Sequence, residues 1–420
     1  MIQRSTWTVP RAAVLLITAA LVFAACSGGT SPTPSANSAV DPNAISGTVV
    51  LSGWQSSPDE GNALTQTLLG FQAKYPKIKV DYQPIAGDYR TVMITKFASH
   101  EVPDLFYVNA DYIREWIAQG FLQPLDDAIA KTKIDTSQFF PAYLSIFQKN
   151  GKTYGLPKDG NTIAMAVNSD IVPTAPKNLD ELVTLAQSLK GKSGLKAPIC
   201  LNAGLDRGLA FLYAQGGSLV SADGKSATID SPASKTAVQW YLDLFKNGLG
   251  MTASDMGAGW CGEALGKKSA AIIFEGGWVD PFMKSTFPDV KYAWSPMPTG
   301  SSGSPVTISY TVSYSIGADS KNKDAAAVLL SYLTGPEGMA TWTKGGVANP
   351  SRKDVQGAPG KEVLIQGSAY AKPGSGFMAG YVDVQKAFQD AMTAEVTGKT
   401  FQADPVIAAT KQAIDKALNQ

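Results

Sequence analysis

The chain has 420 residues, of which 17% are charged and 44% hydrophobic, with 36 basic residues against 35 acidic ones. This even balance argues against nucleic-acid binding, and the low charged fraction against a disordered chain or a long coiled coil. The single histidine, His100, disfavours a multi-histidine metal site and a Ser/His/Asp hydrolase, because both need a positioned imidazole. Length alone predicts two or three domains.

The N-terminal segment has the pattern of a secretory signal peptide. Arg4 and Arg11 precede an uncharged apolar run over residues 12–25, which is shorter than the ~20 residues that a membrane-spanning helix needs. We therefore expect residues 1–25 to be removed. Loss of the two arginines leaves 34 basic residues against 35 acidic ones and a net charge near −1.

The residues before Cys26 resemble a bacterial lipobox. Residues 21–26 read Leu-Val-Phe-Ala-Ala-Cys, with Phe23 in place of the usual Leu or Val. The resemblance implies that Cys26 is lipidated, with palmitate among its acyl chains, and anchors the protein to the extracytoplasmic face of a bacterial cell membrane. Ordinary cleavage that leaves a free thiol is the alternative. We expect residues 26–43 to be the lipidated cysteine and a flexible stalk, because the stretch after Cys26 has nothing to bury.

The mature chain is predicted to open with a strand, a helix and a second strand. Residues 48–54 have a strand-like apolar pattern. Ser57, Pro58 and Glu60 then form a helix start, with the serine as N-cap and the proline in the first helical position. Apolar residues follow at spacings of three and four, and residues 78–82 alternate as a strand does. A strand, helix and strand in this order are the unit of a parallel sheet.

The same alternation continues downstream. Further helices are predicted to start near Asn178, Ser231 and Asp404, and further strands to lie at residues 104–108, 162–167, 270–274 and 310–316. The pattern predicts an α/β protein with more than one sheet, and we find no repeat of fixed period.

Five segments together resemble a known protein family. They are residues 71–80 (FQAKYPKIKV), 103–108 (PDLFYV), 151–159 (GKTYGLPKD), 275–278 (EGGW) and 331–338 (SYLTGPEG). In this order and spacing, behind a lipobox, they resemble the family 1 extracellular solute-binding proteins. These are the sugar-capturing lipoproteins of ABC importers and are related to maltose-binding protein. The resemblance runs from about residue 48 to the C-terminus.

The resemblance implies a type II periplasmic-binding-protein-like fold. Two α/β lobes, each a mainly parallel sheet flanked by helices, would enclose the ligand in the cleft between them. The expected lobes are residues 44–158 with 307–343 and residues 159–306 with 344–420. A ligand that contacts both lobes only in the closed state shifts the population toward closure. We expect a monomer whose partners are a sugar and the importer's membrane permease subunits, without catalytic residues, metal or cofactor.

Sugar hydroxyls favour charged and amide partners, whereas sugar ring faces favour flat aromatic side chains. Trp54 and Gln55 end the first predicted strand, and Glu60 lies in the first turn of the following helix. Asp111 follows the strand at residues 104–108 and aligns with a carboxylate that binds sugar in the family. Wall packing for Trp54 and helix capping for Glu60 or Asp111 are the structural alternatives.

A second group follows the expected crossing between the lobes. Asp159 and Asn161 lie at the crossing, where the family commonly has an acidic residue, although Asp159 also fits a turn. Glu275 precedes two glycines that allow backbone to approach a ligand closely. Trp278 resembles the family's stacking indole, with core packing as the alternative.

Four more aromatic residues are candidate ligand contacts. Trp260 lies in a glycine-rich loop, and Phe377 and Tyr381 fall where maltose-binding relatives contribute late aromatic contacts. Core packing is an equally good interpretation of these three. Tyr310 lies in residues 309–315, where this sequence departs from the family: bulky residues replace the glycine-rich segment of many members and would narrow the site.

Cys200 and Cys261 are the two cysteines that remain once Cys26 is assigned to lipidation. In an exported protein an even pair predicts a disulfide, with two separate buried thiols as the alternative. A bridge that closes about 60 residues would stabilise the second lobe by roughly 4 kcal/mol in the chain-entropy model.

Three other functions remain open from the sequence. A secreted carbohydrate-active enzyme would need two carboxylates at a set spacing, which Glu60, Asp111, Asp159 and Glu275 could supply, but no local motif presents a nucleophile. A surface adhesin would need no closed cleft. A non-sugar solute such as a polyamine could also bind, because carboxylates and aromatic rings attract cations.

Overall fold

The computed structural model describes residues 41–55, 57–192, 194–346 and 348–419. The predicted signal peptide, Cys26 and most of the predicted stalk lie outside the described residues. Within the described part of the chain, no helix is long and apolar enough to cross a membrane.

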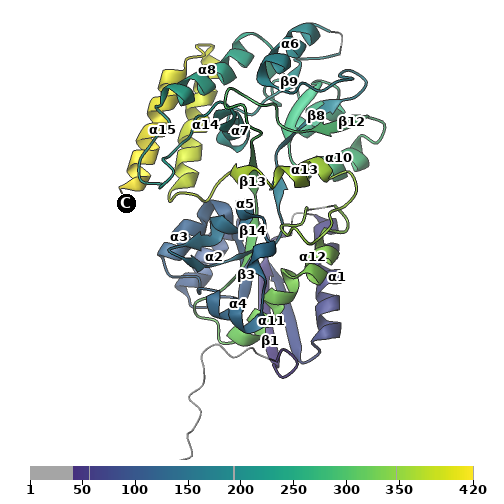
Figure 1. The fold of residues 1–420 in the computed structure, drawn as a ribbon, viewed down its shortest axis with the longest axis vertical. Coiled ribbons are helices and arrows are strands. Elements are labelled where there is room, and N and C mark those ends of the chain that lie inside the picture. The colour runs from purple at the N-terminus through teal and green to yellow at the C-terminus, as the bar shows by residue number, and fades with distance from the viewer. Residues whose placement is uncertain (1–40, 56, 193, 347, 420) are drawn as a thin grey trace, which may run out of the picture. The chain divides into compact units, whose positions relative to one another are not determined.

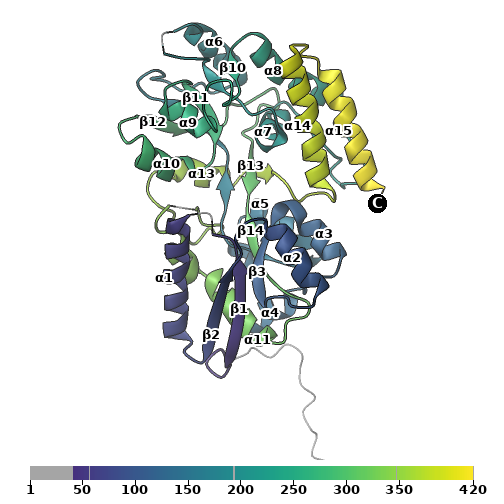
Figure 2. The same ribbon diagram turned by 180° about the vertical axis from the view of Figure 1, so that it is seen from behind.

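The first five-stranded sheet combines the N-terminal strands with strands from later in the chain. β1 pairs in parallel with β2 and β3, whereas β14 runs antiparallel to both β3 and β6. The order across the sheet is β2 (Ile78–Pro84), β1 (Gly47–Gly53), β3 (Leu105–Asn109), β14 (Val312–Ile316) and β6 (Leu156–Pro157). Figure 2 shows β1, β2 and β3 side by side with α1 to one side of them.

The second five-stranded sheet also mixes the two strand directions. β9 pairs in parallel with β10 and β11, whereas β8 runs antiparallel to β11 and β12. The order is β10 (Gly250–Met251), β9 (Ile199–Cys200), β11 (Ile272–Glu275), β8 (Ala164–Asn168) and β12 (Tyr292–Ser295). Both sheets therefore carry more antiparallel pairing than we expected. The antiparallel strands β14 and β8 both enter from the three-stranded sheet, since β13 leads into β14 and β7 leads into β8.

A three-stranded sheet lies where the chain passes between the two larger ones. Its order is β15 (Ala371–Pro373), β13 (Thr307–Tyr310) and β7 (Asn161–Thr162). Only Thr311 separates β13 from β14, so the chain passes from this sheet into the first one within one residue, as Figure 1 shows near its centre. The hairpin of β4 (Gln148–Lys149) and β5 (Lys152–Thr153) completes the strands.

Helices pack on the first sheet around a core that includes Leu51, Phe71, Trp116, Tyr314 and Leu329. They are α1 (Pro58–Lys74), α2 (Tyr89–Ala98), α3 (Ile113–Ala118), α4 (Asp126–Thr132), α5 (Pro141–Leu144), α11 (Lys323–Leu333) and α12 (Pro336–Thr343), with the 3₁₀ turns η1 (Ala110–Tyr112), η2 (Thr136–Gln138) and η3 (Ser145–Phe147).

A separate core lies with the second sheet and includes Met165, Leu209, Leu242, Val384 and Ile414. Its helices are α6 (Leu179–Leu189), α7 (Leu205–Ala214), α8 (Pro232–Lys246), α14 (Tyr381–Gly398) and α15 (Ala403–Leu418). The two C-terminal helices run side by side in Figures 1 and 2. The short helix α13 (Glu362–Gly367) contacts β7, β8 and β12.

A third, smaller core also packs with the second sheet. It contains both cysteines of the predicted pair together with Ile273, Val279 and Met283. Two short helices contribute to it, α9 (Cys261–Gly266) and α10 (Val279–Thr286). The structure joins Cys200 and Cys261 by a disulfide, with their Cα atoms 5.5 Å apart.

The local sequence signals are confirmed where caps mark them. Ser57 caps α1 by accepting a hydrogen bond from the Glu60 N–H, and Asn178 and Ser231 cap α6 and α8 in the same way. α15 begins at Ala403, one residue before the predicted Asp404. The strand predicted over residues 162–167 divides into β7 and β8, which belong to different sheets.

Candidate functional site

A cavity of about 460 Å³ brings together residues that are far apart in the sequence. It is lined by the start of α1, the segment before β8, helix α10 with the residue before it, and the end of α12 with the segment that follows. The lining residues are Ser57, Asp59, Glu60, Asp159, Asn161, Trp278, Pro281, Phe282, Ser285, Trp342 and Ala348. Four of the predicted ligand residues, Glu60, Asp159, Asn161 and Trp278, are therefore neighbours in space.

The carboxylates at one side of the cavity surround a buried cation. The Nζ atom of Lys158 lies 2.8 Å from Oδ2 of Asp159 and 3.6 Å from Oε1 of Glu60. The same Nζ atom is 3.8 Å from the ring centroid of Trp342 and 4.9 Å from that of Tyr107. The lysine side chain is only 3% exposed, so its charge is balanced by these carboxylates and rings rather than by solvent.

Trp342 is fixed by two contacts. Its Nε1 donates to Oδ2 of Asp159 at 3.3 Å, and its ring covers the Lys158 ammonium. Asn161 accepts a hydrogen bond from Nδ2 of Asn349 at 3.2 Å. Asp159 and Asn161 are thus held by partners from α12 and from the segment that follows it, and this order favours a ligand with hydroxyl groups in fixed positions.

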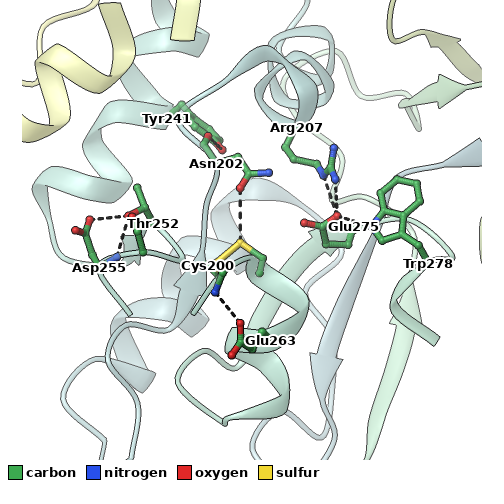
Figure 3. The surroundings of a disulfide bond; sticks show 12 residues. Cys200, Asn202, Arg207, Tyr241, Thr252, Asp255, Glu263, Glu275 and Trp278 are labelled. Carbon is green, nitrogen blue, oxygen red and sulfur yellow. Dashed lines mark hydrogen bonds and ion pairs between the residues drawn. A yellow bond between two sulfur atoms is a disulfide. The ribbon is translucent and has the colours of Figure 1, made fainter. Parts of the chain in front are cut away.

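The Trp278 indole belongs to a network on the second sheet. Its Nε1 donates to Oε2 of Glu275 at 3.0 Å, and Arg207 pairs with the same carboxylate, as Figure 3 shows. A side chain at Gly276 would place a Cβ 2.4 Å from the Trp278 ring, so only glycine allows the indole to lie there. Glu275 is 2% exposed, and burial raises the pKa of its carboxyl while the Arg207 guanidinium opposes that shift.

Helix α10, which begins after Trp278, is fixed by hydrogen bonds and an ion pair of Asp280. Asp280 accepts hydrogen bonds from the Tyr292 hydroxyl and the Trp294 Nε1, and it pairs with the buried Lys361. Lys361 also donates to the Gly277 carbonyl at 2.6 Å. These bonds position the backbone that carries the indole.

The remaining predicted residues of the first core lie beside the cavity or away from it. Trp54 packs edge-on against Tyr89 and Tyr107, with ring centroids 4.9 Å and 5.2 Å away, and Gln55 is exposed over the start of α1. Asp111 lies in η1; burial raises the pKa of its carboxyl, and a hydrogen bond with Ser375 opposes the shift. None of the three belongs to the described lining of the cavity.

The other predicted residues near the second sheet also lie outside the described lining of the cavity. Glu275 accepts the hydrogen bond from the Trp278 indole, Trp260 packs against Phe282, and the Tyr310 hydroxyl donates to the Asp206 carbonyl. Phe377 packs on Tyr381, with ring centroids 5.3 Å apart. Tyr381 is 2% exposed and donates to the Gly374 carbonyl. Their positions favour the packing alternative that the sequence left open for Trp260, Phe377 and Tyr381.

Several residues of the site were not predicted as ligand contacts, among them Lys158, Phe282 and Trp342. Lys158 directly precedes the predicted Asp159, and Trp342 lies in α12, where it is buried with the first core. Phe282 follows Trp278 by four residues on α10, a spacing that places both on one helix face and could have indicated it. Among the described residues, no group of three or more His, Cys, Asp or Glu could hold a metal ion.

Comparison with known proteins decides the family. Residues 55–340, more than half of the chain, match the family model described as bacterial extracellular solute-binding protein. The chain belongs to this family. Its members are binding proteins, so this protein binds a solute outside the cytoplasm.

Curated relatives match different shares of the chain. A putative binding protein of Brucella abortus is 25% identical over 72% of this chain and 75% of its own length. The arabinooligosaccharide-binding protein of Bacillus subtilis is 26% identical over 41% of this chain and 38% of its own length.

Solved structures share the fold. The GacH receptor of Streptomyces glaucescens, solved unliganded and with acarbose, has a TM-score of 0.74 at 24% identity and covers 90% of this chain and 99% of its own. The sugar-binding protein MalE of Xanthomonas citri has a TM-score of 0.77 at 19% identity and covers 89% of this chain and 98% of its own. The fold is therefore the two-lobe periplasmic-binding-protein-like α/β fold, as the sequence predicted.

Proposed function

We propose that the protein captures a sugar, from a monosaccharide to an oligosaccharide, and delivers it to an ABC importer. The observation that carries the proposal is the cavity in which Trp278, Phe282 and Trp342 accompany Glu60, Asp159 and Asn161. Indole rings suit the apolar faces of a sugar ring, and carboxylates and amides suit its hydroxyls. Relatives whose names specify arabinooligosaccharide and maltotriose binding support the same ligand class.

We further propose that the ligand is enclosed by movement of two lobes. The lobes would be residues 44–158 with 307–343 and residues 159–306 with 344–420, with one adjustment. Ala348 and Val355 pack on the first core, and the Phe140 N–H donates to the Ser351 carbonyl. We therefore place the last crossing after residue 355, and assign residues 344–355 to the first lobe.

Anchoring and oligomeric state are part of the proposal. The lipobox-like residues before Cys26 support a lipid anchor on the extracytoplasmic face, and we propose that the protein works as a monomer with the permease subunits of its importer. Mass spectrometry of the protein purified from membranes tests the anchor. A diacylglyceryl mass on the peptide that begins at Cys26 is expected, and an unmodified thiol there would contradict it.

A thermal-shift screen of the purified protein tests the ligand class. At a concentration of 100 times its dissociation constant, a bound sugar stabilises the folded state by about 2.7 kcal/mol. We expect at least one neutral mono- to oligosaccharide to do so. Stabilisation by spermidine alone would instead assign a polyamine ligand, and appearance of cleaved products during incubation would assign an enzyme.

A further inference from the structure

The disulfide lies close to the wall of the proposed sugar cavity. Cys200 ends β9 and Cys261 is the first residue of α9, so the bond fixes the start of that helix to the second sheet. Figure 3 shows the bond among the loop and helix residues of this region, with Trp278 on the same part of the molecule. Both cysteines are buried in the third core, and Trp278 packs against that core.

Trp260 connects the bond to the next helix. It is the residue before Cys261, at the N-cap position of α9, and its side chain makes no capping hydrogen bond. Its ring lies over Gly262, where a Cβ would come within 2.2 Å of it. The ring meets Phe282 edge-on, with centroids 4.8 Å apart. The indole is therefore held between α9 and α10.

Phe282 is the point at which this contact reaches the cavity. It lies on α10, four residues after Trp278, and both side chains line the cavity. The helices involved have only six and eight residues, and helices so short have little stability of their own. Their positions consequently depend on the small core between them and on the covalent bond that crosses it.

We propose that the Cys200–Cys261 disulfide, acting through Trp260, holds Phe282 and the α10 wall of the cavity in the position that binds sugar. Trp260 is thus a positioning residue rather than a ligand contact. The opposite side of α10 is fixed by the bonds of Asp280 with Lys361, Tyr292 and Trp294, so the disulfide side is the second of two supports. This inference rests on the proposed function, because it concerns the wall of the same cavity.

Two measurements on the full-length protein test the proposal. Hydrogen exchange of the α10 amides is followed without sugar, and the dissociation constants for maltotriose and arabinotriose are measured by calorimetry. The variants are Trp260→Ala, Trp260→Phe and the double change Cys200→Ala with Cys261→Ala. Ile414→Ala is the control. Ile414 is buried in the second core on α15, so its replacement by alanine destabilises the molecule without touching the third core.

We expect α10 exchange to accelerate at least tenfold in Trp260→Ala and in the double variant, but not in Ile414→Ala. The dissociation constant should rise at least tenfold in the same two variants. Trp260→Phe should restore most of both properties, because a phenyl ring can keep the edge contact with Phe282.

Three results would overturn the proposal. They are unchanged exchange in α10, equal acceleration in the Ile414→Ala control, and accelerated exchange with unaltered sugar affinity. If the wild-type protein binds neither sugar, the proposed function fails for these sugars. The exchange result then decides the inference by itself, because it needs no ligand.

Discussion

Lys158 is the residue on which the polar side of the cavity depends. Its ammonium faces the carboxylates of Glu60 and Asp159 and the rings of Trp342 and Tyr107, and it is almost fully buried. Removing one partner of a buried ion pair leaves the other charge without compensation, which costs more than the pair itself contributes. The lysine therefore balances the charge of two carboxylates that line the cavity.

Replacement of Lys158 by methionine should lower the free energy of unfolding by about 3 kcal/mol, because two carboxylates lose their buried partner. Urea unfolding measures the change. Lys74→Met is the matched control, since Lys74 pairs with Glu337 with both side chains about half exposed. The control should change stability by at most about 1 kcal/mol. Equal losses in the two variants would contradict the role given to Lys158.

Asp111 gives a pH-dependent prediction. Burial raises the pKa of its carboxyl in the folded protein, so the folded state binds the proton more tightly than the unfolded state does. Stability contributed by this group is present below its ordinary pKa of 3.8 and is lost as the pH rises through the raised value.

Asp111→Asn removes this loss. The variant should gain stability relative to wild type as the pH rises above 3.8 and through the raised pKa of the folded-state carboxyl. Unfolding curves of the two proteins at several pH values measure the difference. A difference that stays constant with pH would show that the carboxyl does not titrate in this environment.

At the scale of elements, α1 brings two acidic residues to the cavity. Its N-cap is Ser57, whose Oγ accepts from the Glu60 N–H at 3.2 Å, and the following turn carries Asp59 and Glu60. The cap thus orders the same turn that lines the cavity.

Ser57→Ala should lower stability by about 1 kcal/mol through loss of the cap. It should raise the dissociation constant for sugar at least about threefold, through loss of preorganisation and of a hydroxyl that itself lines the cavity. Ser231→Ala removes the equivalent cap of α8, whose residues are not among the described lining of the cavity. It should cost similar stability without a change in affinity. Calorimetry and thermal unfolding of both variants check the pair, and equal effects on affinity would refute the prediction.

The sequence predicted elements where the signal is local. Ser57, Asn178 and Ser231 each cap a helix with their own side chain, so the residue type alone predicts where these helices begin. Strand partners were harder to infer, because pairing depends on residues far apart in the chain. The break at Ile163, where the chain leaves the three-stranded sheet and enters the second one, has no local mark in a run of apolar residues.

For the whole molecule, the site could be predicted only in part. Trp278 and Asp159 were indicated by glycines and by the expected crossing, and both line the cavity. Trp342 was not, because it approaches the cavity only when α12 packs on α1. Trp54 follows a strand as a ligand residue would, yet its ring packs between Tyr89 and Tyr107. Tertiary packing, rather than local sequence pattern, therefore decides that Trp342 lines the cavity and that Trp54 does not.

Lobe closure is a property of the whole chain. Because the cavity is lined by α1 and α12 on one side and α10 on the other, a sugar that contacts both should favour the closed arrangement. Small-angle scattering should give a smaller radius of gyration with saturating sugar than without it. An unchanged radius with a sugar that binds would contradict closure.

The most direct test of sugar capture is calorimetric titration of the wild type, Trp278→Ala and Trp240→Ala with a panel of neutral sugars. Trp240 packs on Phe211 in the second core and lies outside the described lining of the cavity. We predict that one sugar binds the wild type and Trp240→Ala with one site per chain, and binds Trp278→Ala at least about thirtyfold more weakly, as expected for a central aromatic contact. Absence of binding by every sugar, or full affinity in Trp278→Ala, would contradict the proposed function.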